Sequence, residues 1–379
     1  MRKIYSLVLL LAVLVLSLTS CSEDNVLYLL NWDEYMCGDL IEAFEAEYNC
    51  EVIVDVAQSN ESMFSKIVSD AAPYDIAIPS DYMIAQMIKC EEDGIDAPII
   101  KKIDYSRLSN YSQDMFDSKL LEMIERDCEG LSGYYVPYFW GSLGIMYNTE
   151  NLTAEQIEII KEKGWAVLFE KELLGNVNIG MYASARDSIA AALLYNGYSI
   201  NTEEEAHLQK ASDSLAKMNY KAWATDDLKA GVASGKYDLA LVYSGDYIDT
   251  YITKLESDDE ITFDFYAPSN NNVFFDAMVM PNNSMNEELA YAFIDFMLEF
   301  DNACENAAYV GYCPTVSKVY QEMLVIDNPD TEEVEGWKMD EISSIPAYYP
   351  GNIKTGEIYK FLGSDTYELY DVIYKRVKK

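Results

Sequence analysis

Histidine is almost absent from this 379-residue sequence, and basic residues are scarce. His207 is the only histidine, and 27 lysines and arginines stand against 65 aspartates and glutamates, giving a formal net charge of −38 at pH 7. A single histidine, predicted to lie on the surface of a polar helix, argues against histidine-based catalysis and histidine-rich metal sites. The acidic excess argues against nucleic acid as a partner, because phosphate binding requires positive charge. The same acidic surface would attract cations.

Paired cysteine motifs are missing as well. Because no CxxC pair occurs, a zinc or redox centre is not expected, and we predict neither a metal site nor a cofactor. Six cysteines follow Cys21: Cys37, Cys50, Cys90, Cys128, Cys304 and Cys313. Outside the cell they could pair in 15 ways, among which sequence cannot choose. Cys304 and Cys313 are the closest pair and our first candidate for a disulfide.

The beginning of the sequence has the features of an export signal. Arg2 and Lys3 precede an apolar run that ends in Leu18-Thr19-Ser20-Cys21. The run is too short for a comfortable membrane span and lacks a positive flank after it. Its end resembles the lipobox of bacterial lipoproteins. We therefore predict that residues 1–20 are a signal peptide and that a lipid on Cys21 anchors an extracytoplasmic protein to the cell membrane, in the periplasm or on the membrane's outer face. Cleavage with release is the alternative.

Strand-like and helix-like segments alternate along the rest of the chain. The first predicted strands are Val26–Leu30, Glu51–Val56 and Asp75–Ile78, separated by predicted helices Cys37–Tyr48 and Glu61–Ala71. This order predicts a parallel sheet with helices on both faces. Later strands are predicted at Gly144–Tyr147, Val177–Gly180, Leu239–Tyr243 and Phe274–Met280. The length suffices for two cores, so we expect an α/β protein with two units of similar size.

The stretch Asn31-Trp32-Asp33-Glu34-Tyr35 is the first candidate site. It lies between a predicted strand and a predicted helix, and small ligands of open α/β sheets bind at such crossings. Two carboxylates between aromatic side chains suit a cationic, partly apolar ligand. The alternative is a helix start, in which the helix dipole favours Asp33 and Glu34 and the aromatic residues pack inward.

Asp276 is the second candidate. It interrupts the apolar run Val273–Val279, where a lone carboxylate is costly unless it is paired, so we expect it to contact a ligand. Asp81 is instead expected to cap a helix. Trp140 and Trp165 are assigned to the core.

Six segments in order resemble the spermidine/putrescine-binding proteins of bacterial polyamine ABC importers. The segments are Asn31-Trp32-Asp33-Glu34-Tyr35, Ser59-Asn60-Glu61-Ser62-Met63, Tyr74-Asp75-Ile76-Ala77-Ile78-Pro79-Ser80, Pro137-Tyr138-Phe139-Trp140-Gly141, Phe275-Asp276 and Gly311-Tyr312-Cys313-Pro314-Thr315. The likeness runs from about Leu27 to the C-terminus. It implies a type II periplasmic-binding-protein fold, in which two α/β lobes close over a polyamine and then dock on the permease of an ABC importer.

The resemblance also implies how the chain is divided. Residues 25–136 and 277–316 would form the first lobe, and residues 137–276 and 317–379 the second. A hinge would lie near Tyr135–Pro137, Asp276 and Pro314, which fits hinges made of a few residues at the ends of elements. We expect a monomeric binding protein that is not an enzyme.

Position by position, the resemblance implies a site built from both lobes. The matched residues are Trp32, Glu34, Tyr35, Ser80, Tyr82, Asp187, Thr225, Tyr243, Phe274, Asp276, Tyr312 and Tyr359. Tyr243 and Phe274 replace two tryptophans of the family, and Tyr359 replaces a glutamine. Asp33 stands where the spermidine binder has threonine, and Ser184 where the family has an acid. The extra acid at one end could compensate for the acid missing at the other.

A polyamine carries two or three ammonium groups on a methylene chain. Its site therefore needs several carboxylates and flat apolar walls, and aromatic rings can attract ammonium groups by cation–π forces. Two alternatives remain: the same fold with another small cationic or metal ligand, and a secreted hydrolase that uses paired carboxylates, as glycosidases do. The absence of any catalytic motif beyond the acids argues against the hydrolase. The sequence does not distinguish spermidine from putrescine.

Overall fold

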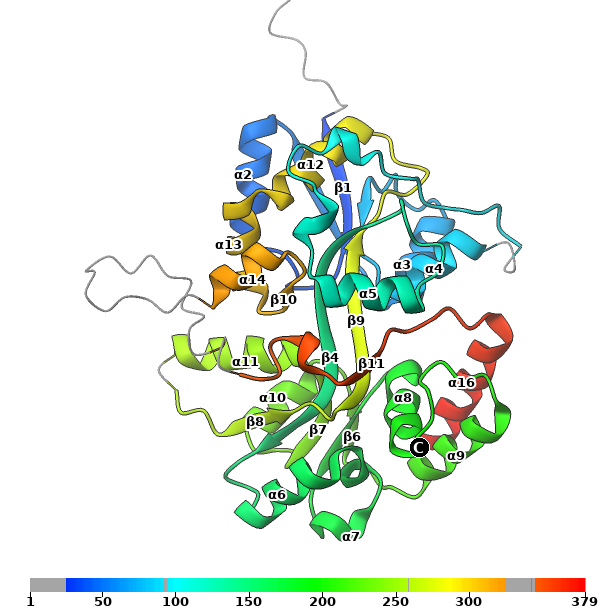
Figure 1. The fold of residues 1–379 in the computed structure, drawn as a ribbon, viewed down its shortest axis with the longest axis vertical. Helices are drawn as coiled ribbons and strands as arrows, with labels where there is room; N and C mark the ends of the chain where they lie inside the picture. The colour runs from blue at the N-terminus through cyan, green and yellow to red at the C-terminus, as the bar shows by residue number, and fades with distance from the viewer. Residues whose placement is uncertain (1–24, 91–93, 258, 325–341, 343–344, 379) are drawn as a thin grey trace, which may run out of the picture.

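The computed structural model describes residues 25–90, 94–257, 259–324, 342 and 345–378. The predicted signal peptide and the lipidation site Cys21 lie outside these residues. Figure 1 shows two groups of helices and strands, one in the upper and one in the lower half of the view. Two long strands run through both groups. In the described part of the chain, no helix is long and apolar enough to cross a membrane.

The first group is built on a parallel three-stranded sheet in the order β2-β1-β3. Its strands are β1 (Val26–Asn31), β2 (Glu51–Val56) and β3 (Ile76–Ala77). The register places Val26 opposite Glu51 and Leu29 opposite Ile76. Its helices are α2 (Gly38–Tyr48), α3 (Asn60–Val68), α4 (Asp81–Lys89), α5 (Ser118–Asp127), α12 (Glu287–Leu298), α13 (Phe300–Val310) and α14 (Ser317–Met323). The predicted parallel sheet in the first part of the chain is therefore confirmed.

The second group contains a mixed sheet in the order β11-β9-β4-β7-β5-β6, with β8 and β10 also paired to β4. Its shorter strands are β5 (Ile179–Tyr182), β6 (Ala222–Ala224), β7 (Leu239–Tyr243), β8 (Phe263–Tyr266) and β11 (Thr355–Glu357). Its helices are α6 (Ala154–Lys163), α7 (Lys171–Leu174), α8 (Ala185–Tyr195), α9 (Glu205–Ala216), α10 (Asp227–Ala233), α11 (Ser244–Glu256) and α16 (Ser364–Val377). Short 3-10 helices lie at Tyr105–Arg107, Gln113–Met115, Gly164–Leu168 and Pro350–Asn352.

Two long antiparallel strands, β4 (Val136–Asn148) and β9 (Asn270–Met278), connect the groups, and β10 (Cys313–Pro314) pairs with β4. The prediction of a strand only at Gly144–Tyr147 was too short. All of β4 is buried, so its sequence lacks the alternation of a half-exposed strand. The register is irregular between Pro137 and Trp140, and Asp276 lies opposite this irregularity. Bulges of this kind redirect side chains next to functional sites.

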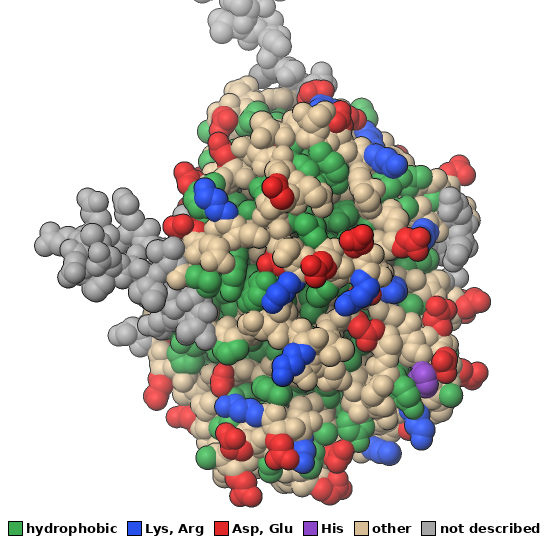
Figure 2. All heavy atoms as spheres, viewed as in Figure 1, with side chains coloured by type: hydrophobic (Ala, Val, Ile, Leu, Met, Phe, Trp, Pro, Cys, Tyr) green, Lys and Arg blue, Asp and Glu red, His purple; other side chains and the backbone are tan. Residues whose placement is uncertain are grey.

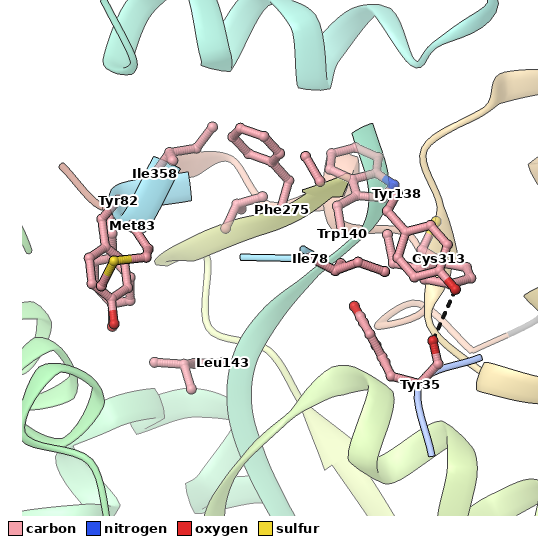
Figure 3. Close-up of a cluster of buried hydrophobic side chains, with 14 of the residues drawn as sticks. Tyr35, Ile78, Tyr82, Met83, Tyr138, Trp140, Leu143, Phe275, Cys313 and Ile358 are labelled. Carbon is pink, nitrogen blue, oxygen red and sulfur yellow. Dashed lines mark hydrogen bonds between the residues drawn. The ribbon is translucent and has the colours of Figure 1, made fainter. Parts of the chain in front are cut away.

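Trp140 and Trp165 lie in the core as predicted. Figure 3 shows Trp140 of β4 among other buried side chains, with Phe275 of β9 nearby. The proposed disulfide between Cys304 and Cys313 was wrong, because all six cysteines of the described residues are free. Helix α13 continues from Cys304 to Val310, about 9 Å at 1.5 Å per residue, before the chain turns into β10. This carries the chain away from Cys304, whereas a disulfide requires close Cα atoms.

His207 is half-buried rather than fully solvated, and its ring stacks on Tyr198 at 3.8 Å between ring centroids. Figure 2 shows acidic side chains on both groups of elements, with basic side chains interspersed.

Candidate functional site

Tyr35 and Asp276 meet where β1 ends and β9 crosses between the two groups. The Tyr35 hydroxyl donates a 2.7 Å hydrogen bond to Oδ2 of Asp276, and both residues are buried. The other oxygen, Oδ1, is buried and accepts no hydrogen bond from the described residues. Burial raises the pKa of Asp276 to about 6, although the nearby hydroxyl groups of Ser80 and Tyr35 lower it. Asp276 therefore presents a buried oxygen to which a cation could bind.

Tyr35 itself is held firmly. The Tyr138 hydroxyl donates to the Tyr35 carbonyl oxygen at 2.9 Å, as Figure 3 shows, and Asn306 donates to the Tyr138 hydroxyl at 2.7 Å. The indole nitrogen of Trp32 donates to the Ile78 carbonyl oxygen at 2.8 Å. The turn after β1 thus fixes two of its aromatic side chains.

A row of aromatic rings runs from Tyr35 into the second group of elements. Ring centroids lie 5.4 Å apart between Tyr35 and Tyr312, 6.0 Å between Tyr312 and Phe274, and 5.0 Å between Phe274 and Tyr243. Each pair packs edge to face, a favourable geometry for aromatic side chains. Gly245 allows this packing, because a Cβ atom there would lie 2.0 Å from the Tyr312 ring. The row brings together four residues that the sequence assigned to the site.

Asp187 lies at the far end of the row. Its Oδ1 atom accepts hydrogen bonds from the hydroxyls of Tyr243 at 2.7 Å and Tyr359 at 3.0 Å. Ser184 is the N-cap of α8, and its hydroxyl accepts from the Asp187 backbone N–H. Asp187 is therefore not the cap, and its carboxylate faces the tyrosines. Burial raises its pKa, which the hydroxyl groups and Arg186 oppose.

Arg186 lies beside this end of the row in a cage of tyrosines. Its guanidinium carbon lies 4.4 Å from the ring centroid of Tyr359 and 5.9 Å from that of Tyr82. Its Nη2 atom donates to Asn201 at 2.9 Å and to the Lys360 carbonyl oxygen at 3.2 Å. A fixed, buried cation thus borders the site at Asp187.

Two residues of the segment Ser59–Met63, Asn60 and Glu61, form hydrogen bonds with Ser80 and Tyr82. Ser80 exchanges hydrogen bonds with Asn60, the first residue of α3, at 3.0 Å in both directions. The Tyr82 hydroxyl donates to Glu61 at 3.0 Å. Ser80 also forms an isolated β-bridge with Asp276, so it lies beside that carboxylate.

Three assigned residues are not part of this buried cluster. Asp33, Glu34 and Thr225 are exposed. Asp81 is fully buried, and its carboxylate accepts backbone N–H groups from Tyr82 at 2.6 Å and from Phe275 at 3.3 Å. Asp81 is the first residue of α4 and Ser80 is its N-cap, so the prediction that Asp81 caps the helix was wrong, although its carboxylate does bond backbone N–H groups.

The sequence analysis missed Asp246. It lies in the first turn of α11 and is buried; its Oδ2 atom accepts the Tyr243 backbone N–H at 3.3 Å, and its Oδ1 atom lies 3.5 Å from the Tyr312 hydroxyl. Burial raises the pKa of Asp246 to about 6, against the lowering effect of Lys229. Tyr182, whose ring packs edge to face on Tyr243, was also missed. Both precede or begin helices, and sequence alone does not separate such positions from ordinary helix starts.

The arrangement suits cation binding. Asp276, Asp187 and Asp246 are buried carboxylates along one aromatic row, and aromatic faces attract ammonium groups. A metal ion fits the described residues less well. Cys37, Asp39 and Glu305 place ligand atoms within 4.8 Å of one another. However, burial raises the pKa of Cys37 and so disfavours the thiolate that a metal needs.

Known proteins resemble the chain over most of its length. The family model described as bacterial extracellular solute-binding protein matches residues 39–333. The spermidine/putrescine-binding periplasmic protein of Escherichia coli is 27% identical over 370 residues, covering 96% of this chain and 94% of the relative.

Solved structures agree with this likeness. A Listeria monocytogenes protein assigned to spermidine/putrescine ABC transport has a TM-score of 0.75 and 31% identity, covering 93% of this chain and 99% of its own. A Treponema pallidum lipoprotein has a TM-score of 0.72 and 25% identity, with the same coverage of the two chains.

Proposed function

The chain belongs to the bacterial extracellular solute-binding proteins, and from this premise we propose that it binds a polyamine outside the cytoplasm and delivers it to an ABC importer. Members of this family serve transport rather than catalysis. The similar proteins from Escherichia coli and Listeria monocytogenes are named for spermidine and putrescine, which supports the choice of ligand.

The observation that carries the proposal is the unpaired Oδ1 atom of Asp276. A buried carboxylate oxygen without a partner is costly, and an ammonium group would supply both charge and hydrogen bonds. The rings of Tyr35, Tyr312 and Phe274 beside it would cover the methylene groups of the ligand. A neutral solute such as a sugar would leave the charge uncompensated.

Magnitudes indicate that more than one acid takes part. Micromolar affinity corresponds to about −8 kcal/mol, after association costs on the order of 4–15 kcal/mol. The four methylene groups of putrescine contribute roughly 3 kcal/mol, at ~0.8 kcal/mol each. One charged hydrogen bond adds about 1.5–3 kcal/mol, which is too little. We therefore assign amine contacts to Asp187 as well as Asp276.

The proposal includes the membrane anchor and the two lobes. Lipidation of Cys21 would keep the protein beside its importer, and a similar protein from Treponema pallidum is a lipoprotein. The two lobes belong to the proposal, with β4, β9 and β10 as the connections; because α14 packs against α13, the first lobe would extend at least to Met323 rather than end at residue 316. The protein would act as a monomer whose two lobes close on the ligand. Closure requires that the ligand bind the closed form better than the open form.

Thermal unfolding and calorimetric titration with putrescine and spermidine test the function. A ligand at 100 times its dissociation constant adds about 2.7 kcal/mol to stability, so the melting temperature should rise. 1,4-Butanediol, which has the same four methylene groups without charge, is the matched control and should have no effect. Folded protein that binds neither amine contradicts the proposed function.

A further inference from the structure

Lys229 lies at the Asp246 end of the aromatic row. It comes from α10, and its ammonium nitrogen is 2.7 Å from Oδ2 of Asp249 and 3.9 Å from Oδ1 of Asp246. Only 21% of its side chain is exposed. A protein cation is thus held beside an acid of the site, between two carboxylates of α11.

Asp246 belongs to the same site as the other acids. It lies between Tyr243, whose backbone N–H it accepts, and Tyr312, whose hydroxyl is 3.5 Å away. Gly245, the residue before it, packs directly under the Tyr312 ring. Asp246 is therefore linked through the Tyr312 side chain to the Tyr35–Asp276 pair.

The three acids differ in their protein cations. Asp276 has no ion pair among the described residues. Asp187 lies beside Arg186, whose guanidinium is fixed by hydrogen bonds and tyrosine rings. Lys229 differs from Arg186 because a lysine ammonium is compact, its stem is flexible, and Asp249 already offers it another partner. Lys229 can therefore leave Asp246 without losing its ion pair.

We propose that Lys229 is a specificity-determining residue that competes with the ligand for Asp246. The inference rests on the proposed function. While Lys229 neutralises Asp246, the site offers its full charge at Asp276 and Asp187 only, which matches the two ammonium groups of a diamine. Lys229 is hydrogen-bonded to Asp249 and holds its charge 3.9 Å from Asp246, so the third ammonium group of a triamine can use Asp246 only against this neighbouring cation or by pushing it farther away. The residue therefore lowers affinity for spermidine more than for putrescine.

Calorimetric titration of Lys229→Met tests the competition. The variant should bind spermidine about tenfold more tightly, the effect of one additional charged hydrogen bond, and putrescine less than threefold more tightly. Lys254→Met is the matched control, because Lys254 forms a comparable 2.8 Å ion pair with Asp259 away from the site. The control removes the same charge and should leave the ratio of the two affinities unchanged.

A second variant should act in the opposite direction. Asp249→Asn removes the carboxylate to which Lys229 is hydrogen-bonded, so the ammonium should move closer to Asp246 and spermidine binding should weaken about fivefold relative to putrescine. Asp259→Asn loses the same charge elsewhere and serves as the control. This variant pair does not depend on the folding of Lys229→Met.

Titration of the Asp246 carboxylate carbon by NMR in ligand-free protein gives a third readout. Asp246 faces Lys229 of α10 and Asp226 at the N-cap of that helix, Asp249 on its own helix, Tyr243 and Tyr182 from β7 and β5, and Tyr312. Removing the only cation of this set should raise its titration midpoint in Lys229→Met.

The outcomes separate the two proposals. Parent protein that binds neither amine overturns the proposed function and this inference together. Parent protein that binds both amines, with an unchanged affinity ratio in Lys229→Met and Asp249→Asn, overturns the inference alone. An equal gain for both amines also overturns the inference, because a general charge effect would then suffice. An unchanged titration of Asp246 in Lys229→Met overturns it as well.

Discussion

The Tyr35 hydroxyl donates a 2.7 Å hydrogen bond to Oδ2 of Asp276, a residue 241 positions later in the chain. The bond uses one carboxylate oxygen and leaves Oδ1 buried without a partner in the described structure. It therefore orients the carboxylate and keeps one oxygen available for a ligand. The same pair connects the turn after β1 to β9, one of the strands that pass between the two groups of elements.

We expect Asp276→Asn to weaken polyamine binding roughly tenfold to a hundredfold. The substitution keeps size and polarity but removes the charge, and a charged hydrogen bond contributes about 1.5–3 kcal/mol. Calorimetric titration with putrescine and spermidine measures the change, after circular dichroism has confirmed the fold.

Asp33→Asn is the control for this experiment. It removes the same charge from an exposed side chain, so affinity should change less than threefold. A substantial loss would instead mean that Asp33 compensates for the acid missing at Ser184. Unchanged binding in Asp276→Asn would show that the proposed ligand contact is wrong.

Asp276→Asn should also stabilise the ligand-free protein at neutral pH. Burial raises the pKa of Asp276 to about 6 in the folded state, against about 3.9 in the unfolded chain. Between these values the folded state holds more protons, so this group lowers stability as pH rises from about 4 to 6 and its cost stays constant above. Asp276→Asn lacks that cost and should gain about 3 kcal/mol at pH 7.5.

Urea unfolding at pH 4.5 and 7.5 measures this effect. The gain of Asp276→Asn over the parent should be small at the lower pH and large at the higher one. Asp246 shifts in the same direction but is present in both proteins, so the difference isolates Asp276. Equal gains at both pH values would contradict the assignment.

The sequence predicts the fold better than it predicts the site. The parallel strands of the first group have separate apolar runs and were found, whereas β4 has no alternation and was found only in part. Asp276 was predictable because a carboxylate in an apolar strand needs a reason. Asp246 and Lys229 were not, because a carboxylate at a helix start and a lysine on a short helix are ordinary. Only the packing of α10 against α11 brings them together.

Gly245→Ala should damage the site through Tyr312. The added Cβ would lie 2.0 Å from that ring, and overpacking a buried position costs roughly 1–3 kcal/mol. Polyamine affinity should fall because Tyr312 must move. Gly38→Ala is the matched control: it begins α2, its Cβ meets nothing within 4 Å, and it should be neutral or slightly stabilising. Urea unfolding and calorimetry compare the two; equal effects would contradict the role given to the Tyr312 contact.

Cys21→Ala should release the protein from the membrane. The segment before Cys21 resembles a lipobox, and a lipid with two or more acyl chains anchors a protein stably, whereas one chain does not. Fractionation of cells that express the parent and the variant measures the membrane-bound share. Cys50→Ala, a change at a free cysteine of the described residues, should leave the parent pattern intact. Parent protein found wholly in the medium would refute the anchor.

Asp187 could grip a terminal amine or only organise Tyr243 and Tyr359, and two substitutions decide between these roles. Asp187→Asn removes the charge that an ammonium group needs, so polyamine affinity should fall at least tenfold. Tyr359→Phe removes one of the two hydroxyl groups that donate to Oδ1 but keeps the charge, so affinity should change less than threefold. If Asp187 only held the tyrosines in place, Asp187→Asn would keep an acceptor oxygen for both hydroxyl groups, and calorimetry would find a loss no larger than that of Tyr359→Phe. Equal losses would therefore remove Asp187 from the ligand contacts and leave Asp276 as the principal acid of the site.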